Sequence, residues 1–138
     1  MHFTPKTFED KLISKYRSQV EGNMFLEVPI GNDKDIWPKG SKTRRIDCIR
    51  VLNNSKDIYR YDDLEIFKDC IKDKHIELIE AKKRLNRLVI GQVIVGIDMF
   101  IKQYKNKNVK GVILCEIGDP ALEIVCKERD IDIVVYNL

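Results

Sequence analysis

His75-Ile76-Glu77-Leu78-Ile79-Glu80-Ala81-Lys82 is a short, mostly apolar segment that we predict to be a buried β-strand, around which the other elements are arranged. Because side chains alternate between the two faces of a strand, Leu78, Glu80 and Lys82 should share one face. Burying a carboxylate and an amine against a sheet is costly unless they are paired or bind a metal ion. This face of the expected strand therefore indicates a chemical function.

The composition fits a small soluble domain, because 43% of the 138 residues are hydrophobic and 34% are charged, which excludes a wholly disordered chain. We expect one domain over residues 1–138. The net charge is only +3, so the total charge is no evidence for nucleic-acid binding. The four cysteines form no C-x-x-C pair, so no zinc site is indicated. No signal-like or membrane-length apolar segment is present, and we expect a soluble, cytoplasmic protein without membrane contact.

The apolar pattern predicts a helix between Thr4 and Gly22 and then an alternation of strands and helices. Strands are expected at residues 24–30, 45–52, 76–82, 109–117 and 131–136, and further helices at 61–73, 88–104 and 120–129. The second half alternates strand and helix with short connections, which implies parallel neighbours and right-handed crossovers. The polar segment from Gly31 to Thr43 should be an exposed loop, with Trp37 as its one large apolar anchor.

Asp47 interrupts an otherwise apolar face of the second expected strand. Regular alternation places Ile46 and Cys48 together on the opposite face. If this strand lies beside the strand of Glu80, the side chains of Asp47 and Glu80 can aim two carboxylates at one point.

Two carboxylates at one point are hard oxygen ligands, which select Mg²⁺ or Mn²⁺ and leave room for phosphate oxygens of a substrate. Lys82 would then lie near the attacking water or the charge that develops on phosphorus, where a fixed cation lowers the barrier. These residue types suit hydrolysis of a nucleic-acid backbone. An E-x-K segment on a strand can also be an ordinary surface ion pair.

Asp47 followed by Glu80-Ala81-Lys82 resembles the D…(D/E)-x-K signature of the PD-(D/E)XK nuclease superfamily, which includes restriction endonucleases, archaeal Holliday-junction resolvases and repair nucleases. The order of helix, three strands, helix and strand resembles the family core and covers most of the chain. The resemblance implies an α/β, restriction-endonuclease-like core with a central mixed five-stranded sheet flanked by helices. The family's proline before the aspartate is absent, since Arg45-Ile46 precedes Asp47, and the helix at 61–73 must be an insertion.

The resemblance also assigns two helical residues to the site. Family members often carry a glutamate in the first helix that joins the two strand carboxylates at the metal, and Glu9 resembles it; Glu21 and Glu27 are weaker substitutes. Many members carry a glutamine in the helix after the E-x-K strand, and Gln92 is placed similarly. Both residues also fit a plain solvated helix surface.

Two groups of basic residues flank the expected site in the sequence. These residues are Lys39, Lys42, Arg44 and Arg45 before Asp47, and Lys83, Arg84 and Arg87 after Lys82. We predict that they hold phosphates on either side of the metal, which gives affinity without reading sequence. A solvated charged surface is the alternative.

We therefore expect a Mg²⁺-dependent DNA endonuclease. The small size favours a structure-selective enzyme, such as a junction resolvase or a repair nuclease, over a sequence-specific restriction enzyme. The resemblance implies a homodimer, because two symmetric sites can cut two strands. One alternative is a module of the same fold that binds nucleic acid without cleaving it, and another is a structural or regulatory α/β protein with no nucleic-acid partner.

Overall fold

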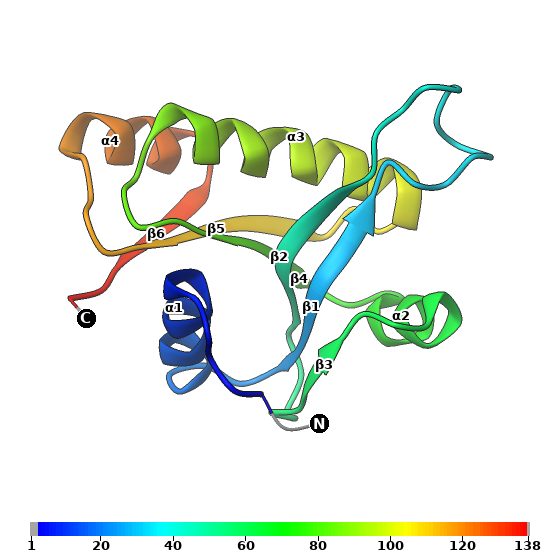
Figure 1. The fold of residues 1–138 in the computed structure, drawn as a ribbon, viewed down its shortest axis with the longest axis horizontal. Helices are drawn as coiled ribbons and strands as arrows, with labels where there is room; N and C mark the ends of the chain where they lie inside the picture. The colour runs from blue at the N-terminus through cyan, green and yellow to red at the C-terminus, as the bar shows by residue number, and fades with distance from the viewer. Residues whose placement is uncertain (1–2, 138) are drawn as a thin grey trace.

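The structure, a computed structural model, describes residues 3–137 and consists of helices and strands that alternate through most of the chain (Figure 1). In chain order these elements are α1 (Phe8–Arg17), β1 (Asn23–Ile30), β2 (Arg44–Val51), β3 (Ile58–Arg60), α2 (Leu64–Ile71), β4 (Ile76–Ala81), α3 (Arg87–Tyr104), β5 (Val109–Cys115), α4 (Pro120–Glu128) and β6 (Ile131–Val135). Each expected helix and strand is present with shifts of a few residues at its ends. None of the helices within residues 3–137 combines the length and apolar character needed to cross a bilayer.

One mixed sheet runs through the molecule in the strand order β3-β1-β2-β4-β5-β6. β1 and β2, and β2 and β4, are antiparallel, while β4, β5 and β6 are parallel as predicted. The α/β class and the mixed sheet are confirmed, but the sheet has six strands and the prediction of five is wrong. The sixth, β3, is three residues long and pairs in parallel with Met24–Leu26 of β1. Three residues are too few to show the alternation by which strands are recognised in a sequence.

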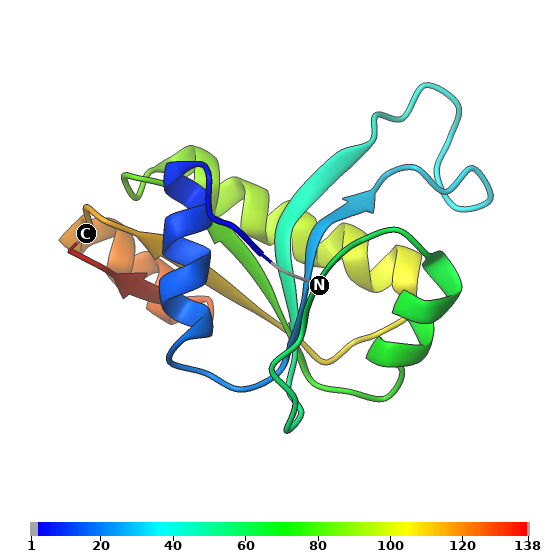
Figure 2. The ribbon, with the colours of Figure 1, turned by 60° about the horizontal axis from the view of Figure 1, so that its bottom comes forward.

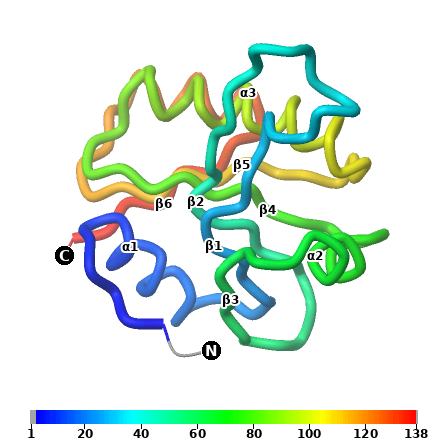
Figure 3. Tube along the Cα trace, turned by 45° about the vertical axis from the view of Figure 1, so that its right-hand side comes forward, coloured from blue at the N-terminus to red at the C-terminus, as the bar shows by residue number. Residues whose placement is uncertain are grey.

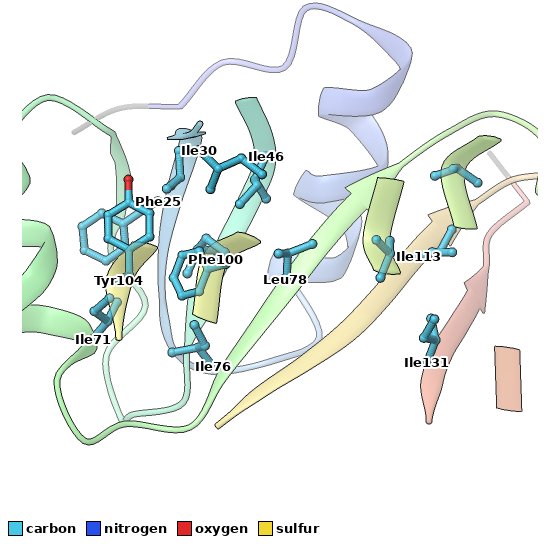
Figure 4. Close-up of a cluster of buried hydrophobic side chains, with 14 of the residues drawn as sticks. Phe25, Ile30, Ile46, Ile71, Ile76, Leu78, Phe100, Tyr104, Ile113 and Ile131 are labelled. Carbon is cyan, nitrogen blue, oxygen red and sulfur yellow. The ribbon is translucent and has the colours of Figure 1, made fainter. Parts of the chain in front are cut away.

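Helices cover both faces of the sheet. In Figure 1, α3 and α4 lie above the sheet and α1 lies below it, and Figure 2 shows α1 in front of the parallel strands. A larger apolar cluster on the α3 side includes Leu78 and Phe100 (Figure 4), and α2 contributes Phe67 to it. A smaller cluster beneath α1 includes Leu12 and Ile79. The residues of β4 contribute to both clusters, as its completely buried pattern requires.

The parallel half of the sheet packs tightly against α3. A Cβ atom at Gly111 of β5 would lie 2.5 Å from a methyl carbon of Val93 on α3. Only a glycine lets the helix approach the strand this closely. This close contact sets the distance between α3 and the sheet, and thereby positions the first turns of α3 near the carboxyl ends of β4 and β5.

The loop from Gly31 to Thr43 projects beyond the sheet and is tied back to the C-terminal end of α3 (Figure 3). The side chain of Gln103 is the tie: its carbonyl oxygen accepts the Gly31 N–H at 2.9 Å and the Trp37 indole N–H at 2.8 Å. Its amide nitrogen donates to the Asn32 side chain at 2.8 Å. Trp37 is thus the anchor of the loop, although it acts through a hydrogen bond as well as through its apolar surface.

Candidate active site

The backbone pairing of β2 with β4 ends where each strand carries a carboxylate, at Asp47 and Glu80. Their antiparallel ladder pairs Cys48 with Ile79, and the same register places Asp47 opposite Glu80 just beyond that pair. There the Asp47 carboxylate accepts the backbone N–H of Ala81 at 2.9 Å, in place of a backbone carbonyl. The two strands are adjacent, as the convergence of the two carboxylates requires.

Half-buried Asp47 and buried Glu80 form a pair of acids. Glu80 is only 8% exposed, and burial, followed by the charge of Asp47, raises the pKa of its carboxyl to about 9. Burial also raises the pKa of Asp47; hydrogen bonds from Glu80 and from the Ala81 N–H partly offset that increase, and the charges of Glu9 and Asp10 add to it. At neutral pH the pair therefore holds a proton between its carboxyl groups.

Next to this pair, the side chains of β1 and β2 change from one face of the sheet to the other. The register pairs Leu26 with Cys48 and Val28 with Ile46, so Glu27 lies opposite Asp47. Leu26 and Cys48 belong to the cluster beneath α1, whereas Val28 and Ile46 belong to the cluster beneath α3. Residues two apart in a regular strand share a face, so the prediction that Ile46 and Cys48 lie on one face is wrong.

The reversal coincides with an unusual backbone conformation. Glu27 has a φ of 59°, in the left-handed region that residues with a Cβ atom rarely adopt. Although Glu27 is exposed, partial burial and the charge of Asp47 raise the pKa of its carboxyl. The distortion therefore turns Glu27 and Asp47 toward one space, where both line the same cleft.

That cleft has a volume of about 960 Å³ and lies between α1, the β1–β2 hairpin and the first turns of α3. Asp47, Glu80, Lys82, Gln92 and Glu9, the five predicted catalytic or metal-binding residues, all line it. The structure thus brings together residues from two strands and two helices that are up to 83 positions apart, from Glu9 to Gln92.

The cap of α1 distinguishes its two first-turn acids. The Thr7 hydroxyl accepts the Asp10 N–H at 3.0 Å, and the Asp10 carboxylate accepts the backbone N–H groups of Lys6 at 3.1 Å and Thr7 at 3.2 Å. This reciprocal capping box engages the Asp10 side chain. Glu9 and Asp10 both line the cleft, but only Glu9 has a carboxylate that does not serve the capping box.

Lys82 and Gln92 are exposed residues at the edge of the cleft. Lys82 follows the last residue of β4, and its backbone N–H donates to the Leu114 carbonyl of β5 at 2.9 Å. Its position is therefore fixed by the sheet, while its amine is free to rotate in solvent. Gln92 lies in the second turn of α3.

The predicted basic residues divide between the cleft and other surfaces. Arg44, Arg45 and Arg87 line the cleft. Lys39 and Lys42 lie on the projecting loop instead. Lys83 places its amine 5.6 Å from the centre of the Phe8 ring on α1, and Arg84 forms a backbone bridge with Ile117, so neither lines the cleft.

Sequence reasoning missed two basic residues of the cleft and gave a minor place to one acid. Lys6 and Arg60 line the cleft, and Glu27 does so opposite Asp47. Arg60 could not be found because β3 itself was not expected. Glu27 belongs to a predicted strand, but its left-handed backbone conformation cannot be predicted from the pattern of apolar residues.

The acid pair has no cationic partner within residues 3–137. The ion pairs found there join Arg50 to Glu77 and Lys110 to Asp130 and Asp132, and none reaches Asp47 or Glu80. In the same part of the chain, no three His, Cys, Asp or Glu side chains form a ready metal-holding group. The donor set itself fits a hard divalent cation, because two carboxyl groups with no protein cation share one cleft with Glu9.

Comparisons of the chain with protein-family models, with curated proteins and with solved structures gave no match.

Proposed function

We propose that this protein is a Mg²⁺-dependent nuclease that hydrolyses phosphodiester bonds in DNA. The observation that carries the proposal is the pair of half-buried Asp47 and buried Glu80, which has no cationic side chain as partner within residues 3–137 and opens into a cleft. A structural pair of this kind would cost folding free energy without return, whereas a divalent cation between the carboxylates offsets that cost. The proposed fold is the restriction-endonuclease-like core that the D…(D/E)-x-K resemblance implies.

Each of the five predicted site residues has a role in this proposal. Asp47 and Glu80, with Glu9 as the third acid, hold Mg²⁺ or Mn²⁺. The cation supplies Lewis acidity and lowers the pKa of a bound water. Lys82 orients the attacking water and stabilises the charge that develops on the phosphate oxygens, and the Gln92 amide hydrogen-bonds to the substrate strand.

The shared proton of the acid pair makes the site responsive to cations. Because carboxylate ligands bind a metal in their ionised form, the pair loses its proton when a divalent cation binds. The ordered backbone N–H of Ala81 then continues to fix one oxygen of Asp47. Both acids belong to strands, Asp47 to β2 and Glu80 to β4, so the sheet and not a loop positions their other carboxylate oxygens.

The arginines of the cleft bind the DNA backbone. Arg44 and Arg45 come from the start of β2, and Arg87 is the first residue of α3, so cations stand on two sides of the acid pair. Contacts of this kind hold phosphates without reading base sequence. Because we assign these arginines to phosphates, we propose a structure-selective enzyme of the junction-resolving or repair type.

The proposed enzyme acts as a homodimer, as the family resemblance implies. β6 is an edge strand of the sheet, and Val135 at its end is 44% exposed. The neighbouring helix α4 exposes Ile124 by 62% and Val125 by 45%. These exposed apolar side chains of β6 and α4 support this surface as the contact between two copies.

The test is cleavage of labelled single-stranded, duplex and four-way-junction DNA in Mg²⁺, Mn²⁺ or EDTA. The wild type should cut in either cation and not in EDTA, and Asp47→Asn and Lys82→Ala should each lower the rate at least about a hundredfold. Lys83→Ala is the matched control, because Lys83 is the adjacent exposed lysine but does not line the cleft.

Cleavage that survives in EDTA, or that Lys83→Ala reduces as much as Lys82→Ala, would overturn the proposal. DNA binding without cleavage in any cation would identify the protein as a binding module of the same fold. Absence of both would leave the acid pair without a nucleic-acid role.

A further inference from the structure

One wall of the cleft is apolar and open. Leu88 is 64% exposed and Val95 is 52% exposed, although both line the cleft. They stand seven residues apart on α3, two helical turns along one face. Gly91 lies between them, and a Cβ atom added there would meet nothing within 4 Å. Leu88, Gly91 and Val95 thus form a shallow apolar strip, which we call the α3 strip.

The surroundings of the α3 strip are cationic. Arg87 precedes it on the helix, and Arg44, Arg45 and Arg60 line the same cleft from the hairpin and β3. Apolar side chains of the hairpin, Ile30 and Ile46, also contribute to the lining. An apolar wall with arginines around it matches a ligand that carries phosphates and apolar faces together.

Unpaired nucleotides have this combination of surfaces. In a duplex the bases are stacked and paired, so the surface beside a scissile phosphate consists of further phosphates and sugars. Apolar side chains contact base faces only where bases are unstacked, flipped or single-stranded. A cleft built only for a duplex backbone would leave Leu88 and Val95 facing charged groups.

We propose that the α3 strip binds unpaired bases beside the scissile phosphate, so that the substrate is single-stranded DNA or a single-stranded flap. The inference takes its substrate class from the proposed nuclease function and adds a preference for unpaired strands. The arginines hold the phosphates of the unpaired strand, while its base faces pack on Leu88 and Val95 over the gap at Gly91.

The test measures binding separately from cleavage. Fluorescence anisotropy in EDTA and in Ca²⁺ should be recorded with a labelled oligodeoxynucleotide, its blunt duplex and the same duplex with a single-stranded flap, at one salt concentration. The single strand and the flap should bind at least about tenfold more tightly than the blunt duplex. Cleavage in Mg²⁺ should follow the same order.

Variants of the strip separate apolar contact from charge. Leu88→Ala combined with Val95→Ala should weaken binding of the single strand about three- to tenfold and change duplex binding little. Ile66→Ala is the control, because Ile66 is 59% exposed on α2 and does not line the cleft. Circular dichroism verifies that each variant is folded.

The possible outcomes distinguish the inference from the proposed function. Equal or tighter binding of the blunt duplex overturns the inference even if the protein is a nuclease. A single-strand preference that the double variant removes, without cleavage in any cation, supports the strip while the nuclease function fails. If the double variant instead changes the sedimentation coefficient of the free protein, the strip is a protein contact and the inference is overturned.

Discussion

Glu77 and Glu80 stand on the same strand with the same exposure, 8%, yet their surroundings are opposite. Glu77 accepts the Tyr16 hydroxyl at 2.7 Å and forms an ion pair with Arg50 at 2.8 Å. Glu80 meets Asp47, a second acid whose pKa is also raised. Burial alone therefore does not distinguish a functional carboxylate from a structural one. The partner does, because a buried acid paired with a cation serves the fold, whereas one beside a second acid needs a ligand or a proton.

The surroundings of Glu77 and of Glu80 also differ in the elements that they connect. The Arg50 guanidinium lies 5.9 Å from the centre of the Tyr16 ring, so Glu77, Arg50 and Tyr16 form one network between α1 and the sheet. Burial, together with the hydrogen bond to Glu77, raises the pKa of the Tyr16 hydroxyl and keeps it a neutral donor. Within residues 3–137, no ion pair connects the acid pair on the other side of the strand to a cationic side chain.

The largest expected contrast is in activity. Glu80→Gln should reduce Mg²⁺-dependent cleavage at least about a hundredfold, because the remaining carboxylates no longer provide the charge that holds the cation. Glu77→Gln should leave cleavage by the folded protein nearly unchanged. Initial rates across a Mg²⁺ titration, at a temperature where both variants are folded by circular dichroism, measure this contrast. Equal losses in the two variants would remove the distinction between the two acids.

For stability the order of the two variants should be reversed, with the larger loss in Glu77→Gln. Glu77→Gln should lower the free energy of unfolding by about 3 kcal/mol, because it leaves the Arg50 side chain, which is only 13% exposed, without its counter-charge. Glu80→Gln should not destabilise the metal-free protein, because an uncharged amide replaces a group that burial keeps protonated. Urea denaturation monitored by circular dichroism gives both values. A loss in Glu80→Gln as large as in Glu77→Gln would show that Glu80 has a structural partner.

The pH dependence of stability should reveal the same acid. The pKa of Glu80 lies near 9 in the folded protein and near 4.5 when unperturbed, so the unfolded chain binds fewer protons between these values. Stability is then fully present below pH 4.5 and is lost as the pH rises toward 9. We expect a loss on the order of 2–3 kcal/mol between pH 5 and pH 9 without metal, allowing for solvent screening.

Glu80→Gln is the control for that titration, since it removes the group responsible. Its stability should vary less than that of the wild type over the same range. Added Mg²⁺ should also flatten the profile of the wild type, because it replaces the proton. An unchanged slope in Glu80→Gln would place the titrating group elsewhere.

The smallest expected effect separates the neighbouring acids of α1. Glu9→Gln should raise the Mg²⁺ concentration for half-maximal cleavage about tenfold and leave stability nearly unchanged. Asp10→Ala should instead lower the free energy of unfolding by about 1 kcal/mol, because it removes half of the capping box. Thermal melts and Mg²⁺ titrations of both variants suffice. If Asp10→Ala shifts the Mg²⁺ requirement more than Glu9→Gln, the assignment of Glu9 as third acid is wrong.

The sequence was sufficient for features that repeat along the chain. Long apolar runs and the alternation of strand and helix predicted the parallel half of the sheet, because burial of both strand faces leaves a continuous signal. The adjacency of Asp47 and Glu80 followed from placing two polar residues on neighbouring strands. The register then brought these residues opposite each other.

Features set by tertiary contact left no such signal. The three residues of β3 pair with β1 only because the chain returns beside that strand. The reversal at Glu27 depends on one backbone torsion. Lys83 and Arg84 are close to the acid pair in the sequence but do not line the cleft, because the chain turns away from it directly after Lys82 and returns to it only at Arg87; their part in DNA binding stays a prediction.

The hydrogen bond from the Ala81 backbone to the Asp47 carboxylate gives this site a built-in spectroscopic reporter. The chemical shift of an amide proton depends on the charge of its acceptor, and this amide belongs to the residue that follows Glu80. In a nitrogen–proton correlation spectrum, the Ala81 resonance should therefore move both when the acid pair loses its proton and when a cation enters. A single backbone signal would then follow occupancy of the site in solution, without substrate and without turnover.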